Sequence, residues 1–238
     1  MISIVTTCMG RREHLEKTLG PMLNQEAAEP VEVVVVDYSC PQAAAWWAKS
    51  LQLRDDQRLT VVEYRGATEF NRCHSRNLGA RHSEASTVQG SIIIFLDADA
   101  IVQPTFAQEM ADELRAGASL TLVNWTDKRE RGVGVMGIHA SSFYAARGWD
   151  EGMEGWGWED VDFGNRVIAK TTGPIEYIDG SLIQLIRHSE EHRTAFHAIK
   201  NRRVSRSQNR KRGRDKDRPI NPLGFGLMAS SVWHSWKE

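Results

Sequence analysis

The chain has 238 residues, enough for one sizeable domain, and its 41% hydrophobic and 26% charged content is ordinary for a globular protein. No apolar run approaches a membrane span, and the opening MISIVTT is too short for a signal peptide, so we expect a soluble, cytoplasmic chain with no transmembrane segment. The three cysteines, Cys8, Cys40 and Cys73, match neither a disulfide framework nor a zinc spacing and are expected to be free thiols.

The net charge of −1 is unevenly distributed along the chain. Residues 187–218 hold 12 Lys or Arg against 4 Asp or Glu, a net of +8, whereas residues 1–186 hold 17 against 26, a net of −9. A basic block on an acidic body favours an anionic partner.

The first half of the chain alternates segments typical of strands and helices. Strands are predicted at residues 2–7, 31–37, 59–64 and 91–99. Helices are predicted at residues 11–25, 41–53 and 71–85, the second of them with Pro41 at its start. This order predicts an α/β fold with a doubly wound sheet, and ligand sites at the carboxyl ends of its strands.

The second half is less regular. Strands are predicted at residues 119–125 and 133–137, helices at 140–148 and 159–170, and two short strands about Gly180 within 175–186. The segment 200–218 is poor in apolar residues and is predicted to be a mobile loop or a frayed helix.

Two aspartates end the strand predicted at residues 91–99. Alternation along an extended backbone places Asp97 and Asp99 on one face, with Ala98 on the other. Two carboxylates at the end of a buried strand are costly unless a cation joins them, and a divalent metal bound to a nucleotide diphosphate fits that need. The structural alternative is a solvated turn in which Asp99 caps the helix near Pro104.

Two further polar residues follow predicted strands. Asp37 could accept a hydrogen bond from a nucleobase or ribose, and capping of the next helix is an equally open alternative. His188 could bring an imidazole to the Asp99 metal if the second half folds over the sheet. A carboxylate with an imidazole favours manganese-like ions over magnesium.

The stretch GWGWEDVDFGNR, residues 155–166, sets two tryptophans among glycines directly before a group of acids. Glu159 and Asp160 suit the first turn of a helix, which explains the acids. A helix start does not explain the tryptophans.

In their order along the chain, these segments resemble a GT-A glycosyltransferase, specifically the β-1,4-galactosyltransferase or family 2-like group of inverting enzymes. The segments that carry the resemblance are RREHLEKTL (11–19), EFNRCHSRNLGA (69–80), FLDADAIVQP (95–104), GWGWEDVDFGNR (155–166) and LIRHS (185–189). The resemblance implies a single GT-A (Rossmann-like) domain over 1–238, with a mainly parallel sheet flanked by helices. Its expected parts are a nucleotide-binding half at 1–100, an acceptor and catalytic half at 101–188, a basic mobile loop or lid at 189–218, and a C-terminal tail at 219–238.

The resemblance also implies a role for individual residues. The expected donor-binding residues are Thr6, Arg11, Asp37, Phe70, Arg72, Asp97 and Trp156, with Arg11 at the diphosphate and Trp156 on a mobile loop beside the sugar. Asp99 and His188 would bind Mn²⁺ or Mg²⁺. Asp160 would be the catalytic base, and Glu159 would hold acceptor or donor hydroxyls.

The implied function is metal-dependent, inverting transfer of a hexose or N-acetylhexosamine from a UDP-sugar to a hydroxyl of a carbohydrate or another acceptor. The chain departs from the family pattern at Leu185, where the family has a methionine ligand, at Trp158, where it has a glycine, and at Val161, where it has an acid. Gly134 and Val135 replace a bulky aromatic, which could admit an N-acetyl group.

Two other functions stay open: a nucleotidyltransferase, and a degenerate transferase scaffold that binds sugar or nucleic acid. Likewise the basic segment is expected first as a lid over the donor, and alternatively as a surface that contacts a polyanion.

Overall fold

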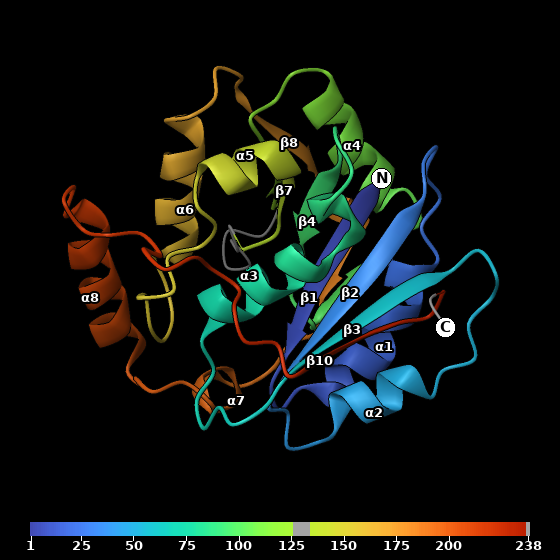
Figure 1. The fold of residues 1–238 in the computed structure, drawn as a ribbon, viewed down its shortest axis with the longest axis horizontal. Coiled ribbons are helices and arrows are strands. Elements are labelled where there is room, and N and C mark those ends of the chain that lie inside the picture. The colour runs from blue at the N-terminus through green and yellow to red at the C-terminus, as the bar shows by residue number, and fades with distance from the viewer. Residues whose placement is uncertain (126–133, 237–238) are drawn as a thin grey trace.

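The computed structural model describes residues 1–125 and 134–236, and its centre is one twisted sheet with helices on both faces (Figure 1). Within these residues the sheet has eight strands in the order β10-β3-β2-β1-β4-β7-β6-β8. The strands are β1 (Ile2–Cys8), β2 (Val31–Tyr38), β3 (Arg58–Tyr64), β4 (Ile92–Phe95), β6 (Leu120–Asn124), β7 (Met136–His139), β8 (Ile175–Asp179) and β10 (Ser231–His234). Strands β1 to β4 are parallel, as are β6 and β8, whereas β7 and β10 run antiparallel to their neighbours.

Apolar side chains cover both faces of this sheet, which explains why its central strands are continuous apolar runs. One face packs against α1 (Arg12–Leu23), α2 (Ala44–Lys49) and α4 (Phe106–Arg115). The other face packs against α3 (Arg72–His82), α5 (Ala140–Ala145) and α6 (Glu159–Ile168). The expected α/β fold with a mainly parallel sheet flanked by helices is therefore confirmed. A separate two-stranded antiparallel sheet joins β5 (Ala100–Val102) to β9 (Ile183–Leu185).

Most predicted elements begin and end within three residues of the observed ones, and two, β4 and α2, differ more. Strand β4 stops at Phe95 instead of continuing to Asp99. Helix α2 is only six residues long, because Ala43 takes a left-handed conformation (φ 52°) and Pro41 lies in the turn before it. The strand predicted at 133–137 is observed at Met136–His139, and residue 133 lies outside the described residues.

The basic segment contains two helices, α7 (Glu190–Thr194) and α8 (Arg202–Arg214). Of the two alternatives expected for the segment 200–218, a mobile loop or a frayed helix, the structure has a helix at residues 202–214. Helix α8 begins at a side-chain cap, in which Asn201 Oδ1 accepts hydrogen bonds from the N–H groups of Arg203 and Val204. Its buried residues are polar, so the sequence lacks the apolar stripe by which such helices are found. Helix α8 lies beside α6, away from the sheet (Figure 1).

Two expectations drawn from composition can be compared with the fold. In the part of the chain that the structure describes, no helix is long and apolar enough to cross a membrane. Cys8, Cys40 and Cys73 are free and buried, as expected.

Candidate active site

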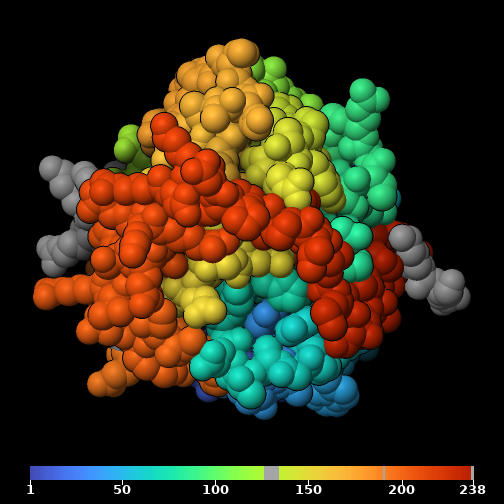
Figure 2. Space-filling model, turned by 60° about the vertical axis from the view of Figure 1, so that its left-hand side comes forward, coloured from blue at the N-terminus to red at the C-terminus, as the bar shows by residue number. Residues whose placement is uncertain are grey.

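A cavity of about 600 Å³ opens at the carboxyl ends of the parallel strands, where the α/β order places ligand sites. Its walls come from the segments after β1, β4 and β6, from the start of α6, from the chain after β9, and from α7 and α8. Figure 2 shows the chain after residue 190, in orange and red, running over the yellow segment near residue 150 that leads to α6.

Most of the residues expected at the site line this one cavity. They are Arg11, Phe70, Arg72, Asp97, Asp99, Trp156, Glu159, Asp160 and His188. They are brought together from segments up to 177 positions apart in the chain, such as those of Arg11 and His188.

Asp99, His188 and Arg11 form one polar cluster on the cavity wall. His188 Nε2 lies 2.6 Å from Asp99 Oδ2. The guanidinium Nη1 of Arg11 lies 3.1 Å from that carboxylate oxygen and 2.8 Å from the same imidazole nitrogen. Asp99 therefore does not cap the helix after Pro104, because the residue at the N-cap of α4 is Thr105.

This cluster fits a divalent cation in its donor chemistry. A carboxylate oxygen and an imidazole nitrogen converge on one point, and the Arg11 cation already lies against both of them. Among the described residues, no group of three or more His, Cys, Asp or Glu side chains forms a metal site. A metal held by Asp99 and His188 would thus need oxygen ligands from a bound substrate or from water. Leu185, which lines the same cavity, has no ligand atom to offer.

Asp97 lies in a turn rather than on an extended strand, because β4 ends two residues earlier. Its Oδ1 accepts a hydrogen bond of 2.9 Å from Nη2 of Arg76, a buried arginine whose guanidinium stacks 4.5 Å from the Trp149 ring. Burial acts to raise the pKa of Asp97, but the charges of Arg76, Arg72 and Arg11 outweigh it, and the pKa is lowered. Asp97 is therefore held as a carboxylate.

Glu159 and Asp160 open α6 on the cavity wall, after Trp158 in a left-handed conformation (φ 76°). Glu159 Oε1 accepts a hydrogen bond of 2.8 Å from Arg72, while its buried Oε2 has no partner among the described residues. Burial, and next the charge of Glu159, raise the pKa of Asp160. The two neighbouring acids thus differ in environment, one in an ion pair and the other not.

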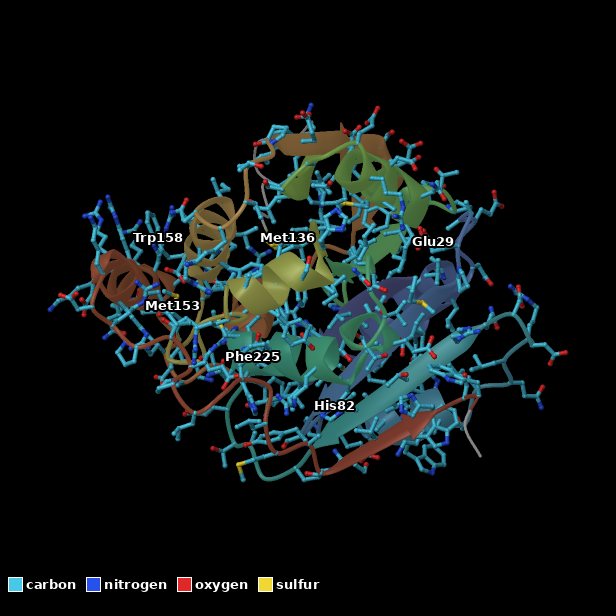
Figure 3. The ribbon with its side chains drawn as sticks, turned by 45° about the horizontal axis from the view of Figure 1, so that its top comes forward. Glu29, His82, Met136, Met153, Trp158 and Phe225 are labelled. Carbon is cyan, nitrogen blue, oxygen red and sulfur yellow. The ribbon has the colours of Figure 1, made fainter. Side chains whose placement is uncertain are left out.

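The glycine–tryptophan segment before α6 is tied to α8. The Trp156 N–H donates to Ser205 Oγ (3.1 Å), and that hydroxyl donates to the Trp156 carbonyl (2.9 Å). Asn209 Nδ2 donates to the carbonyls of Glu154 (3.0 Å) and Gly157 (2.9 Å). Figure 3 shows Trp158 between α6 and α8, where Arg210 lies 5.2 Å from its ring.

Two of the expected donor-binding residues do not reach the cavity. Thr6 is fully buried, and its neighbour Thr7 lines the cavity instead, because side chains alternate along β1. Asp37 is also fully buried, and its carboxylate accepts hydrogen bonds from the N–H groups of Cys40 and Ala45, both at 2.7 Å. For Thr6 the expectation is corrected to Thr7, and for Asp37 the geometry matches the capping alternative.

The sequence analysis missed several residues of this site. Arg76 lies one helical turn after Arg72 on α3, and that i, i+4 spacing was a signal that could have revealed it. His192, Phe196 and His197 also line the cavity. Burial, and next the charge of Arg72, lower the pKa of His197 to about 3, so this imidazole is neutral.

Comparison with known proteins places this geometry in a family. Residues 3–156 match the family model described as Glycosyl transferase family 2. Chondroitin sulfate synthase 3 of Homo sapiens is 28% identical in an alignment 142 residues long that covers 49% of this chain and 15% of that protein.

Solved structures share the fold. TarS residues 1–349 of S. aureus match with a TM-score of 0.61 at 15% identity, over 76% of this chain and 59% of that one. The mannosyltransferase PcManGT from Pyrobaculum calidifontis, in complex with GDP-Man and Mn²⁺, matches with a TM-score of 0.61 at 18% identity, over 92% of this chain and 65% of that one. TarS 1–349 has also been solved in complex with UDP-GlcNAc.

The chain spans less than two thirds of the length of each of these relatives. The family match, by contrast, covers more than half of this chain. With its strand order, its helices on both faces and its cavity at the strand ends, the chain belongs to glycosyl transferase family 2.

Proposed function

We propose that the chain is a metal-dependent, inverting glycosyltransferase that moves a hexose or N-acetylhexosamine from a UDP-sugar to an acceptor hydroxyl. The observation that carries this proposal is the position of Asp160, whose pKa is raised, in the same cavity as the Asp99–His188 pair. One wall thus offers a base for an acceptor, and another offers ligands for a metal and a diphosphate.

Asp160 is the general base in this proposal. Its Oδ1 accepts a hydrogen bond of 2.8 Å from the Val161 N–H, which orients the carboxylate at the start of α6. A raised pKa makes this carboxylate a stronger proton acceptor than an ordinary surface aspartate. Asp160 takes the proton of the acceptor hydroxyl while the oxygen attacks the anomeric carbon, and a single displacement inverts that carbon.

The opposite wall of the cavity binds the donor. Arg11 carries a positive charge toward the Asp99–His188 pair, and Arg72 lies beside Asp97 and Glu159. Asp99 and His188 would hold a divalent ion such as Mn²⁺ or Mg²⁺, which would neutralise the charge on the departing diphosphate. The complexes of TarS with UDP-GlcNAc and of PcManGT with GDP-Man and Mn²⁺ support a nucleotide-sugar donor and a metal.

Glu159 accepts a hydrogen bond from a sugar hydroxyl, and Trp156 packs against the C–H face of a sugar ring. The buried Oε2 of Glu159, which lacks a partner among the described residues, is an acceptor for a substrate hydroxyl. Trp156 lines the cavity and offers an apolar ring face. Gly134 and Val135 line it as well, and room for an N-acetyl group beside them stays a prediction.

The first prediction concerns Asp160→Asn. This variant should keep UDP-sugar binding and lose sugar transfer by about 100-fold or more, the usual scale for a positioned general base. Transfer is measured as release of UDP in the presence of acceptor and Mn²⁺, and donor binding by calorimetry. Asp112→Asn, an exposed position on α4, is the matched control and should transfer at the rate of the unaltered protein.

Transfer by Asp160→Asn at nearly the original rate would place the base elsewhere, with Glu159 and Asp162 the next residues to test. If the unaltered protein binds UDP-sugars and neither transfers nor hydrolyses any of them, the binding-protein alternative replaces this proposal.

A further inference from the structure

A second cavity, of about 640 Å³, adjoins the active site. It is lined by Trp156, Glu191, Thr194, Lys200, Asn201, Arg202, Arg203 and Arg206. Three of these residues, Trp156, Arg202 and Arg206, also line the first cavity. The two cavities therefore share a wall formed by the tryptophan and by two arginines of α8.

The lining of this second cavity is strongly cationic. Four cations, Lys200, Arg202, Arg203 and Arg206, face one carboxylate, that of Glu191. Arg203 and Arg206 are exposed, and among the described residues neither forms an ion pair with a carboxylate. Such an excess of positive charge around a concave space recognises an anion.

The place of this cavity separates it from the donor diphosphate. The residues that it shares with the active site are Trp156, Arg202 and Arg206. Arg11, Asp99 and His188 do not line it. An anion held here is therefore bound apart from the Arg11, Asp99 and His188 cluster. The donor phosphates, by contrast, have their own cation in Arg11.

The cations of the second cavity stand on an ordered support. Helix α8 is anchored by Ser205 and Asn209, which hydrogen-bond the backbone of residues 154–157. The guanidinium of Arg202 stacks 3.6 Å from the Trp156 ring centre, so the aromatic wall and the cationic wall are one unit.

We propose that the second cavity is an acceptor subsite for an anionic saccharide, whose carboxylate, sulfate or phosphate ester groups are held by Arg203, Arg206 and Lys200. The subsite rests on the proposed function, because it extends the site at which the acceptor hydroxyl is deprotonated. Among the described residues, Trp156 is the single aromatic side chain of this cavity, and a nucleic-acid strand would need a series of stacking surfaces. The geometry therefore favours an acidic saccharide over a nucleic acid.

The test measures the binding affinity of four tetrasaccharides for the full chain saturated with UDP and Mn²⁺. All four share one backbone. Three carry uronic acid, sulfate or phosphate groups, and the fourth is neutral because its carboxyl groups have been reduced. At least one charged form should bind about tenfold more tightly than the neutral form at low salt, and raising the salt should reduce this difference. The charged form that binds best identifies the anionic group. Arg203→Ala should weaken its binding about five- to tenfold, whereas Lys211→Ala, exposed on the same helix but outside both cavities, should change it less than about twofold.

Equal affinity for all four tetrasaccharides would overturn the subsite, as would equal effects of Arg203→Ala and Lys211→Ala. Tighter binding of a single-stranded oligonucleotide of the same charge than of every saccharide would replace it with a nucleic-acid surface. Binding of UDP with Mn²⁺, measured separately, keeps the two proposals apart. If UDP does not bind, the proposed function fails; if UDP binds and charge preference is absent, only the subsite fails.

Discussion

Glu159 and Asp160 are adjacent in the chain, and their surroundings give them different chemistry. Glu159 is paired with Arg72, which itself lies among carboxylates. Asp160 has no arginine in hydrogen-bond contact among the described residues, and burial beside the Glu159 charge raises its pKa. When the surroundings of two acids shift their pKa values in different ways, the two acids can take different roles, one as a base and the other as a binding group.

A second prediction follows from the raised pKa of Asp160. In the folded protein the carboxylate is disfavoured relative to the unfolded chain, so its ionisation destabilises the fold at pH values above the raised pKa. Asp160→Asn removes that penalty, and near pH 7 it should unfold at an equal or higher temperature than the unaltered protein. The difference should shrink as the pH falls through the raised pKa and vanish below about 3.9, where aspartate is protonated in both states.

Thermal unfolding of both proteins over this pH range is the measurement, with Asp112→Asn as a control for the loss of one surface charge. A variant that is less stable near neutral pH, and whose deficit disappears on acidification, would mean that the Asp160 carboxylate stabilises the fold. The pKa of Asp160 would then be lowered in the folded protein rather than raised.

At the scale of elements, α8 and the segment 154–157 form one structural unit. Gly155 has φ +72°, and a Cβ placed there would lie 2.7 Å from Ser205 Cβ, so the helix approaches too closely for a side chain. Trp156 was expected on a mobile loop. Because this segment is in close contact with α8, any swing of Trp156 has to carry the helix or break its hydrogen bonds.

A third prediction tests this unit through Asn209→Ala. The substitution removes three hydrogen bonds to the backbone of Glu154 and Gly157, and leaves polar groups of this contact without partners. We expect it to lower the free energy of unfolding by about 2–3 kcal/mol. Urea unfolding measures this, with Gln208→Ala, at the exposed position directly before Asn209, as the matched control.

Limited proteolysis of the same two variants reports on α8 directly. Trypsin should cut Asn209→Ala between residues 202 and 214 faster than Gln208→Ala, because the anchored helix is loosened. Equal unfolding midpoints and equal cleavage would show that these hydrogen bonds do not hold α8 in place. Closure of residues 189–218 over a bound donor stays a proposal, and protection from trypsin by UDP-sugar with Mn²⁺ is its check.

At the scale of the whole molecule, the uneven charge of the sequence has a structural meaning. Within the basic block, α7 and α8 contribute His192, Arg193, Arg202 and Arg206 to the cavity wall. The acidic residues Asp97, Asp99, Glu159 and Asp160 line the same cavity, and three of them accept hydrogen bonds from arginines. Both signs of charge thus meet at one cavity that is built for anionic and hydroxyl-bearing ligands.

The order of strands and helices could be predicted from sequence because each central segment is a local apolar pattern. Features that depend on tertiary contacts could not be predicted from the sequence. The pairing of β4 ends at Phe95, opposite Val5 of β1 and Met136, the first residue of β7, although β1 continues to Cys8 and the apolar run to Leu96. The alternation argument for Asp97 and Asp99 was therefore wrong about the backbone, while both side chains still reach the cavity.

The same limit explains the errors at single positions. Nothing in the local sequence distinguishes a threonine that faces the cavity from its neighbour that faces the core, which is how Thr6 was named in place of Thr7. The sequence left helix α8 as only one of two alternatives, because Ser205 and Asn209 bury polar groups against a segment some fifty residues earlier in the chain. Such long-range hydrogen bonds leave no periodic pattern to detect.

The measurement that tests the central claim most directly is calorimetric titration with UDP in the presence and absence of Mn²⁺. The account predicts that Mn²⁺ tightens UDP binding by at least about tenfold, that Asp99→Ala and His188→Ala each abolish this gain, and that Asp56→Ala, at an exposed position after α2, does not. GDP should bind more weakly than UDP. Metal-independent UDP binding, or a Mn²⁺ gain that persists in both site variants, would contradict a metal-dependent donor site at the ends of the strands.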